Sequence, residues 1–277
     1  MKTIVVPVNF SPSSDNAARY AADMAKVIGA SLHLVHVLQM TVGAAEIAMT
    51  EYLFEEIQDS ALEGLRLLRE ELVNWSDDKV PVFTHIEVGA LEYQLKEFCA
   101  ANIPFVVIMG NPGDSLERDL AGSTLAGAIH RLAYPLIVVP ANAVFHSIKK
   151  IMLACDLEDI TSGIPVPSSF LRELRDCFGS SFEVINICTA KKDHHNEAED
   201  AFEFKCWKDR LHKLYPEVHF LRVNNVEDGI GNYLGDHPAD LLLVFPKKYH
   251  WYEFHARRSK KIALLSSVPV MSIHGGN

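Results

Sequence analysis

A glycine-containing loop is the stretch of this sequence whose residue types and spacing could do chemistry. Gly110 and Gly113 follow an apolar run at residues 105–109, and Gly122-Ser123 precede an Ala/Leu-rich segment typical of a helix. Glycine allows backbone angles closed to other residues and lets a ligand approach the main chain. A strand, a glycine loop and a helix N-terminus together form an anion cradle, because unpaired N–H groups and the helix dipole face the loop. The spacing therefore predicts a phosphate site.

The elements that must position this loop alternate between strands and helices. Apolar runs predict strands at residues 4–8, 31–38, 80–88, 105–109 and 136–139. Helical spacing predicts helices at 12–28, 44–75, 91–99 and 123–133, the first opened by Ser11-Pro12 and closed by Gly29. The expected inner stripe of the second helix is Leu53, Ile57, Leu62, Leu65, Leu68 and Leu72. This order is typical of a parallel α/β sheet.

The pattern then restarts in the second half of the chain. Strands are expected at residues 151–156, 182–188, 218–223, 241–245 and 269–273, and a helix at Phe204, Trp207, Leu211 and Leu214. The link at residues 141–147 contains no long Gly/Ser or charged tract. The sequence therefore predicts two packed domains, residues 1–145 and 146–277.

Composition narrows the class of protein. A net charge of −10 argues against broad binding to nucleic acid or to anionic membranes. The five cysteines form no Cys-x-x-Cys pair, which favours reduced, buried thiols. No apolar stretch approaches the length of a membrane span. We expect a soluble cytoplasmic protein.

Several segments together resemble the universal stress protein family. They are residues 4–11 (IVVPVNFS), the strand 33–37 (HLVHV), the glycine loop and the strand that begins at Pro135. The resemblance spans nearly the whole chain as a tandem of two domains, strong in the first half and eroded in the second. It implies two Rossmann-like domains of the adenine nucleotide alpha-hydrolase-like type. Each would be a five-stranded parallel sheet in the order 3-2-1-4-5, with helices on both faces.

The resemblance also implies a nucleotide site in the first domain. Many members of the family bind ATP or another adenine nucleotide, and the reversal of winding between strands one and four opens a crevice at their carboxyl ends. Residues implied for the adenine and ribose are Pro7, Val8, Asn9 and Val37, and those implied for the phosphates or their strand are Met109, Gly110, Gly113, Gly122, Ser123 and Thr124. ATP, ADP or AMP are the candidate ligands, with Mg²⁺ only if ATP is bound.

The loop departs from the pattern of the ATP-binding members of the family, which is Gly-x2-Gly-x9-Gly-Ser. Here eight residues, 114–121, separate the second and third glycines. Pro112 removes one backbone donor, and three carboxylates stand beside a single cation, Arg118. Asn9 replaces the usual Asp, so that position brings no charge to a metal. These changes leave an empty site as an alternative.

The second domain is expected to bind no nucleotide in the family manner, because Pro246-Lys247-Lys248 stand where the glycines should be. Residues 247–261 mix cations with aromatics, which either form a patch for RNA, acidic lipid or an acidic partner or anchor a loop; we favour the anchor. His194-His195 are assigned to a solvated loop rather than to a metal site. His33 and His36 should face opposite sides of their strand.

The residues show no nucleophile–base–acid arrangement and no P-loop lysine. We therefore expect a non-catalytic stress-response protein that binds or senses an adenine nucleotide and acts on an unidentified protein partner. The alternatives are a tandem scaffold with both sites empty and a slow nucleotide hydrolase. The two domains could pair internally as a pseudo-dimer, or two chains could form a homodimer.

Overall fold

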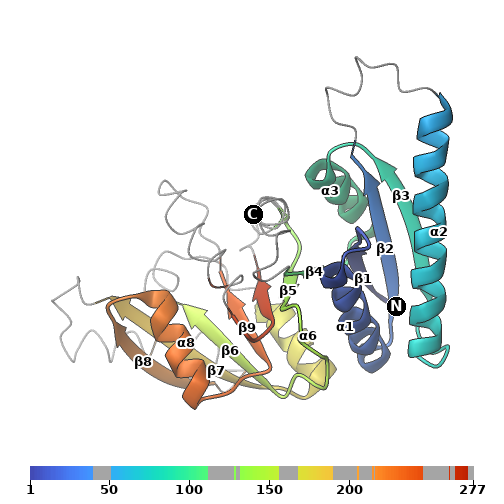
Figure 1. Ribbon diagram of the computed structural model, residues 1–277. Coiled ribbons are helices and arrows are strands. Elements are labelled where there is room, and N and C mark those ends of the chain that lie inside the picture. Colours follow the sequence, from blue (N-terminus) through green and yellow to red (C-terminus); the bar gives the residue numbers. More distant parts are fainter. Residues whose placement is uncertain are drawn as a thin grey trace. The chain divides into compact units, whose positions relative to one another are not determined.

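The protein divides into two compact units, Met1–His146 and Ser147–Asn277, which are described one at a time. The computed structural model in Figure 1 describes residues 1–39, 51–111, 128, 132–155, 168–189, 205, 214, 216–245, 262 and 266–273. Among these residues, no helix combines the length and the apolar character needed to cross a membrane.

The first unit is built on five parallel strands. Its elements are β1 (Lys2–Pro7), α1 (Pro12–Ile28), β2 (Ala30–Leu38), α2 (Glu51–Trp75), β3 (Val82–Val88), α3 (Leu91–Asn102), β4 (Val106–Gly110) and β5 (Leu136–Val139). The pairings place the strands in the order β3-β2-β1-β4-β5. This confirms the expected doubly wound α/β sheet with the order 3-2-1-4-5.

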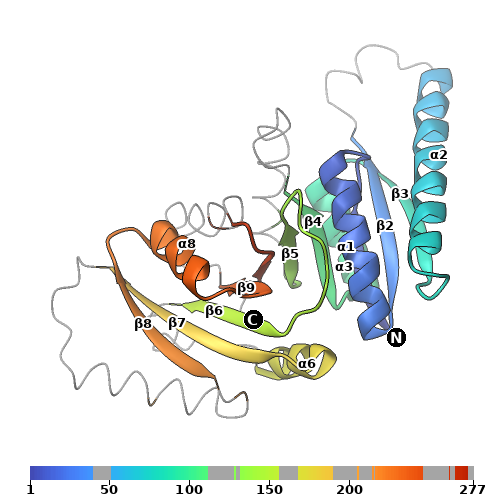
Figure 2. The same ribbon diagram turned by 60° about the horizontal axis from the view of Figure 1, so that its bottom comes forward.

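Helices cover both faces of this sheet. On β2, the side chain of His36 lies on the side of α2, whereas that of His33 lies against Phe98 of α3. Figures 1 and 2 show the same arrangement, with α1 and α2 on one face and α3 on the other. The central strands are therefore buried on both sides, and Ile4, Val5 and Val6 of β1 have no exposed surface. Continuous apolar runs are what such strands require.

The first helix begins and ends as its sequence indicates. The Ser11 side chain accepts a hydrogen bond from the N–H of Ser14, and Pro12 occupies the first helical position. Gly29 ends the helix in the left-handed conformation, with φ 64°. Both boundaries predicted for α1 are confirmed.

The inner stripe expected for α2 is only half right. Leu65, Leu68 and Leu72 are buried, and Ala61 joins them one turn earlier. The remaining members, Leu53, Ile57 and Leu62, are between 42% and 50% exposed. Both views show the first turns of α2 extending beyond the ends of β2 and β3, so the described sheet does not cover the part of the helix that carries Leu53 and Ile57. Leu62 follows the buried Ala61 directly, so it is exposed because it lies on another side of the helix. Residues 44–50, also expected in this helix, lie outside the described residues.

The second unit repeats the same sheet. Its elements are β6 (Lys150–Cys155), α6 (Ser168–Phe178), β7 (Ser181–Thr189), β8 (Glu217–Val223), α8 (Val226–Asp236), β9 (Leu241–Val244) and β10 (Val270–Ser272). The parallel pairings give the order β8-β7-β6-β9-β10, the counterpart of the first unit. The sequence analysis did not predict α6, although Leu171, Leu174 and Phe178 are buried at helical spacing.

One contact fixes the start of α1 against the end of β4. A Cβ atom added at Gly110 would lie 2.1 Å from the carbonyl oxygen of Ser13, which is backbone and cannot swing away. Gly110 is not among the described residues with a positive φ, so its backbone angles do not demand glycine. The sequence-based reason given for this glycine, unusual angles, is therefore wrong: glycine is needed here because a helix approaches the strand closely.

We predict that Gly110→Ala lowers the free energy of unfolding by about 2–4 kcal/mol, because the helix or the strand must shift to admit the methyl group. Urea denaturation of the full chain measures the loss. Gly231→Ala is the matched control, since a Cβ atom at Gly231 in α8 meets no atom within 4 Å. That variant should be neutral or more stable by about 1 kcal/mol. Equal stability of Gly110→Ala and the wild type would contradict the packing argument.

Candidate functional site

The candidate site of the first unit lies at the carboxyl ends of β2, β1 and β4. The strand order reverses between β1 and β4, which is where parallel α/β sheets open a crevice for ligands. Pro7 and Gly110 are the last residues of β1 and β4. Val8 and Val37 are buried near the same edge, while Asn9 is exposed. The structure thus brings together the described members of the predicted set.

The remaining predicted residues cannot be placed. Gly113, Gly122, Ser123 and Thr124 lie outside the described residues, and so does Arg118. Met109, the residue before Gly110 on β4, is 8% exposed. The role assigned to the glycine loop therefore stays a prediction, while the strand ends that would flank it are in place.

A small hydrogen-bond network holds the turn between β1 and α1. The side-chain oxygen of Asn9 accepts from the Ser11 backbone N–H at 3.2 Å and from the Ser11 hydroxyl at 2.7 Å. The Asn9 backbone N–H in turn donates to the Ser14 hydroxyl at 3.4 Å, and that hydroxyl donates to the Ser11 carbonyl at 3.0 Å. The turn is therefore preorganised by its own side chains, and the amide oxygen of Asn9 already has two donors.

Phe10 occupies an unusual backbone conformation at the centre of this turn. Its φ of 61° lies in the left-handed region, which costs a bulky residue about 1–3 kcal/mol unless the surroundings compensate. Its ring stacks on His36 with centroids 4.7 Å apart, and it lies against Gly64 of α2, where an added Cβ would meet the ring at 2.8 Å. Glycine at position 64 makes room for this ring.

His36 anchors the other side of the stack. Its Nδ1 atom lies 2.8 Å from the carbonyl oxygen of Val8, and since a carbonyl can only accept, Nδ1 donates. The sequence analysis included Phe10 only within the segment 4–11, predicted for His36 only the side of its strand, and did not mention Gly64. Their association depends on a positive φ and on a contact between distant segments, neither of which has a local sequence signal.

The first turn of α1 carries the described carboxylate closest in sequence to this network, Asp15. Burial raises its pKa, opposed by a hydrogen bond from Ser14 and by the charge of Arg19. At the end of β4 the strand pairing continues one residue past Gly110, since the Asn111 N–H donates to the Val139 carbonyl at 2.8 Å. Asn111 is 3% exposed.

Metal-binding groups and the thiol of Cys99 were the other candidates for chemistry among the described residues of the first unit. No group of three or more His, Cys, Asp and Glu side chains among them is arranged to hold a metal ion. Cys99 is fully buried in α3, and burial raises its pKa to about 12, which keeps the thiol protonated and unreactive. Cys99 is thus a core residue, as predicted.

The corresponding edge of the second unit is only partly described. The strands β6 and β9 end at Cys155 and Val244, and residues 156–167 and 246–261 after them lie outside the described residues. The predicted Pro246-Lys247-Lys248 segment, the mixed cationic and aromatic stretch 247–261, and His194-His195 all fall outside as well.

Comparisons with known proteins agree with this geometry. The model of the universal stress protein family matches residues 1–140. A curated universal stress protein of Methanocaldococcus jannaschii is 27% identical over 141 residues, which cover 50% of this chain and 81% of that protein.

Two solved structures extend the likeness to both units. A universal stress protein from Archaeoglobus fulgidus is 14% identical with a TM-score of 0.73, covering 99% of this chain and 97% of the other. A protein of unknown function from Pseudomonas aeruginosa is 13% identical with a TM-score of 0.60, covering 99% and 92%. At these identities the structures show a common fold. With the family model matching half of the sequence, the chain belongs to the universal stress protein family.

Proposed function

We propose that the first unit binds an adenine nucleotide, ATP, ADP or AMP, at the carboxyl ends of β1, β2 and β4. The protein would sense the bound nucleotide and would not hydrolyse it. The observation that carries the proposal is the preorganised turn at the end of β1. Asn9 is exposed at the end of β1, where the strand order reverses towards β4. Its side chain accepts hydrogen bonds from Ser11, which hold the turn. A preformed turn spends little ordering entropy when a ligand binds.

The described residues fit a ribose better than a metal. Asn9 offers an exposed amide at the crevice, a group that bonds hydroxyls. It carries no charge that would hold a metal ion on its own. A magnesium ion would therefore arrive with the phosphates of ATP rather than occupy a protein site of its own. Efficient phosphoryl transfer needs positioned cations, so the function that we propose is nucleotide binding without catalysis.

A second candidate function is a tandem scaffold with both nucleotide sites empty. One observation favours it: Gly110, a member of the predicted phosphate loop, is required by the approach of α1 whether or not a ligand binds. The second unit fits the scaffold role directly, since its loop lacks glycines after β9 and we propose that it binds no nucleotide in the family manner. It would instead present a surface to a protein partner.

Nucleotide binding is tested on the purified full chain. Mass spectrometry of a denatured extract identifies any small molecule that co-purifies, and a thermal-shift series compares ATP, ADP, AMP and adenosine with GTP as the control. A true ligand at a hundredfold excess over its Kd adds about 2.7 kcal/mol and raises the midpoint accordingly. A nucleotide-free extract together with no thermal shift for any adenine compound would contradict nucleotide binding and leave the tandem scaffold as the remaining function.

Hydrolysis is tested separately, because a contaminating ATPase would mimic a weak activity. We expect no steady release of ADP from ATP above that of a Gly122→Glu variant, which places a carboxylate in the predicted phosphate loop. Release that the wild type shows and Gly122→Glu loses would instead establish the slow hydrolase.

Asn9→Asp should strengthen binding of ATP in the presence of Mg²⁺ by up to about tenfold, because a carboxylate at this edge can attract the metal. Asp keeps the oxygen that accepts from Ser11, so the turn is retained. With EDTA the same variant should bind ATP more weakly than the wild type, through repulsion between like charges. Isothermal titration measures both, and Asn9→Ala, which loses the acceptor, is the control. Tighter binding that is independent of Mg²⁺ would contradict the proposal.

A further inference from the structure

The peptide bond between Val8 and Asn9 is held at both of its polar groups. Its carbonyl oxygen, on Val8, accepts a hydrogen bond from Nδ1 of His36 at 2.8 Å. Its N–H group, on Asn9, donates to the hydroxyl of Ser14 at 3.4 Å. One end of this peptide is therefore bonded to β2 and the other to α1. Because a peptide is planar, it cannot turn without weakening both bonds.

The His36 side chain supplies the partner of the Val8 carbonyl. The Val8 N–H donates to the Val35 carbonyl of β2 at 2.9 Å, as in a parallel ladder. The Val8 carbonyl bonds to a side chain of β2 instead, since β1 ends at Pro7 and the chain turns away after it. Val8 is 4% exposed, so a carbonyl that lost this donor would have little access to water in its place.

Both neighbours of Asn9 in the chain contact His36. Val8 accepts its hydrogen bond, and the ring of Phe10 stacks on its ring with the two planes 24° apart. Phe10 is in turn packed against Gly64 of α2. His36 lies on β2, which is paired with β1 on one side and with β3 on the other. Asn9 is thus placed between two residues that one side chain of the sheet holds.

We propose that His36 is a positioning residue of the nucleotide site, which orients Asn9 through Val8 and Phe10 and does not itself contact the ligand. This inference rests on the proposed function, because it concerns how Asn9 meets an adenine nucleotide. A binding group contributes its full affinity only if it is held within about 0.5 Å of the productive geometry. Asn9 is exposed and lies beyond the end of β1, so contacts from neighbouring elements must hold it there.

The second unit has a different residue at the position equivalent to His36. Gly29 and Gly179 follow the last residues of α1 and α6 in the left-handed conformation, with φ of 64° and 67°. His36 and Asn186 each lie seven residues after these glycines. An asparagine therefore fits at this position of the fold, which makes it a natural replacement in a test of His36.

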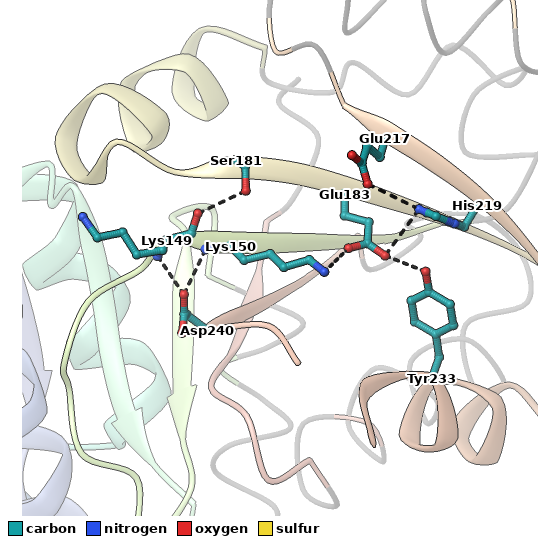
Figure 3. A network of polar contacts seen from close by, with 8 residues as sticks. All are labelled: Lys149, Lys150, Ser181, Glu183, Glu217, His219, Tyr233 and Asp240. Atoms are coloured by element: carbon teal, nitrogen blue, oxygen red, sulfur yellow. Dashed lines mark hydrogen bonds and ion pairs between the residues drawn. The ribbon is translucent and has the colours of Figure 1, made fainter. Parts of the chain in front are cut away.

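The buried polar cluster of the second unit lies on the other face of the equivalent strand (Figure 3). Glu183 precedes Asn186 by three residues, and side chains alternate along a strand. The Glu183 side chain, 4% exposed, forms an ion pair with Lys150 of β6 and accepts a hydrogen bond from the Tyr233 hydroxyl of α8 at 2.5 Å. Nε2 of His219 lies 3.6 Å from its Oε1. This Glu183 cluster belongs to the second unit, so it offers a control substitution that leaves the turn of the first unit untouched.

Two substitutions separate the hydrogen bond of His36 from its ring. His36→Phe keeps an aromatic ring beside Phe10 but has no donor for the Val8 carbonyl. His36→Asn keeps a donor, because Nδ2 of asparagine, like Nδ1 of histidine, is bonded to Cγ. Isothermal titration of the full chain with AMP, and with ATP and Mg²⁺, should show binding about tenfold weaker for His36→Phe and within about threefold of wild type for His36→Asn. Equal losses in both variants would contradict a role for the bond to Val8.

Two controls exclude a general loss of stability as the cause. His33→Phe makes the same change on the same strand, at a residue that bonds to His85 on the face covered by α3. Tyr233→Phe removes the hydroxyl that donates to the buried Glu183. Both controls should bind nucleotide within about twofold of wild type, even where urea denaturation shows a lower stability. Controls that lose as much affinity as His36→Phe would overturn the proposal.

Gly64→Ala replaces His36→Phe if that variant does not fold. A Cβ atom at position 64 would meet the Phe10 ring at 2.8 Å, so the ring must move from its place on His36. Nucleotide binding should again weaken, by about three- to tenfold. Wild-type affinity in Gly64→Ala would contradict the part of the proposal that runs through Phe10.

Hydrogen exchange of the nucleotide-free chain distinguishes this inference from the proposed function. The segment that contains Val8 and Asn9 should exchange about three- to tenfold faster in His36→Phe than in the wild type. A wild type that binds no adenine compound contradicts the proposed function, and with it the role of His36 in binding. A wild type that binds, beside a His36→Phe variant of unchanged affinity, contradicts the positioning role alone, whether or not the segment exchanges faster.

Discussion

The approach of α1 to the end of β4 is the constraint on which the first unit depends. The Ser13 carbonyl occupies the space that a side chain at position 110 would need, so β4 must end in glycine for α1 to cross the sheet here. Because α1 begins there, the turn between β1 and α1 lies next to the end of β4, where the strand order reverses. A glycine that a sequence motif associates with phosphate therefore has a structural cause as well, and its presence alone cannot indicate a ligand.

The turn itself is stabilised independently of any ligand. Asn9, Ser11 and Ser14 satisfy one another's hydrogen bonds, and the ring of Phe10 is held between His36 and the gap above Gly64. A left-handed φ at a phenylalanine persists only where surrounding contacts compensate for it. The turn at the end of β1 therefore has its own hydrogen bonds and ring contacts, and a ligand at this edge of the sheet would meet a surface that is already formed.

The second unit keeps the frame of the first but places its polar chemistry elsewhere. Its glycine loop is gone from the sequence, while a buried carboxylate lies beneath α8. A buried carboxylate destabilises the fold unless it is paired. Removing one partner of a buried pair destabilises the protein more than replacing the whole pair by apolar residues does. Lys150, Tyr233 and His219 supply the partners of Glu183 from three different elements. The two units therefore share a fold while their buried polar groups differ.

The sequence by itself determined the sheet. Sequence patterns located the ten described strands within about two residues. For the central strands the reason is that burial on both faces requires a continuous apolar run, whereas the outer strands β3 and β8 are partly exposed and carry mixed sequences. The caps of α1 were equally clear, since Ser11, Pro12 and Gly29 act through local backbone geometry. The exposed members of the expected stripe on α2 show the limit. Helical spacing does not reveal how far the sheet beneath extends, which matters for Leu53 and Ile57, and it assigned Leu62 to the buried side although its neighbour Ala61 lies there.

Only the tertiary structure decided which distant residues meet. The Phe10–His36 stack, the Ser13–Gly110 contact and the Glu183 cluster each join segments that are far apart in the chain and have no shared local signal. Alternation along β2 did predict that His33 and His36 face opposite sides, but their partners come from other elements. Local sequence fixes backbone conformation and hydrophobic faces, whereas register and helix packing determine which polar groups come within bonding distance.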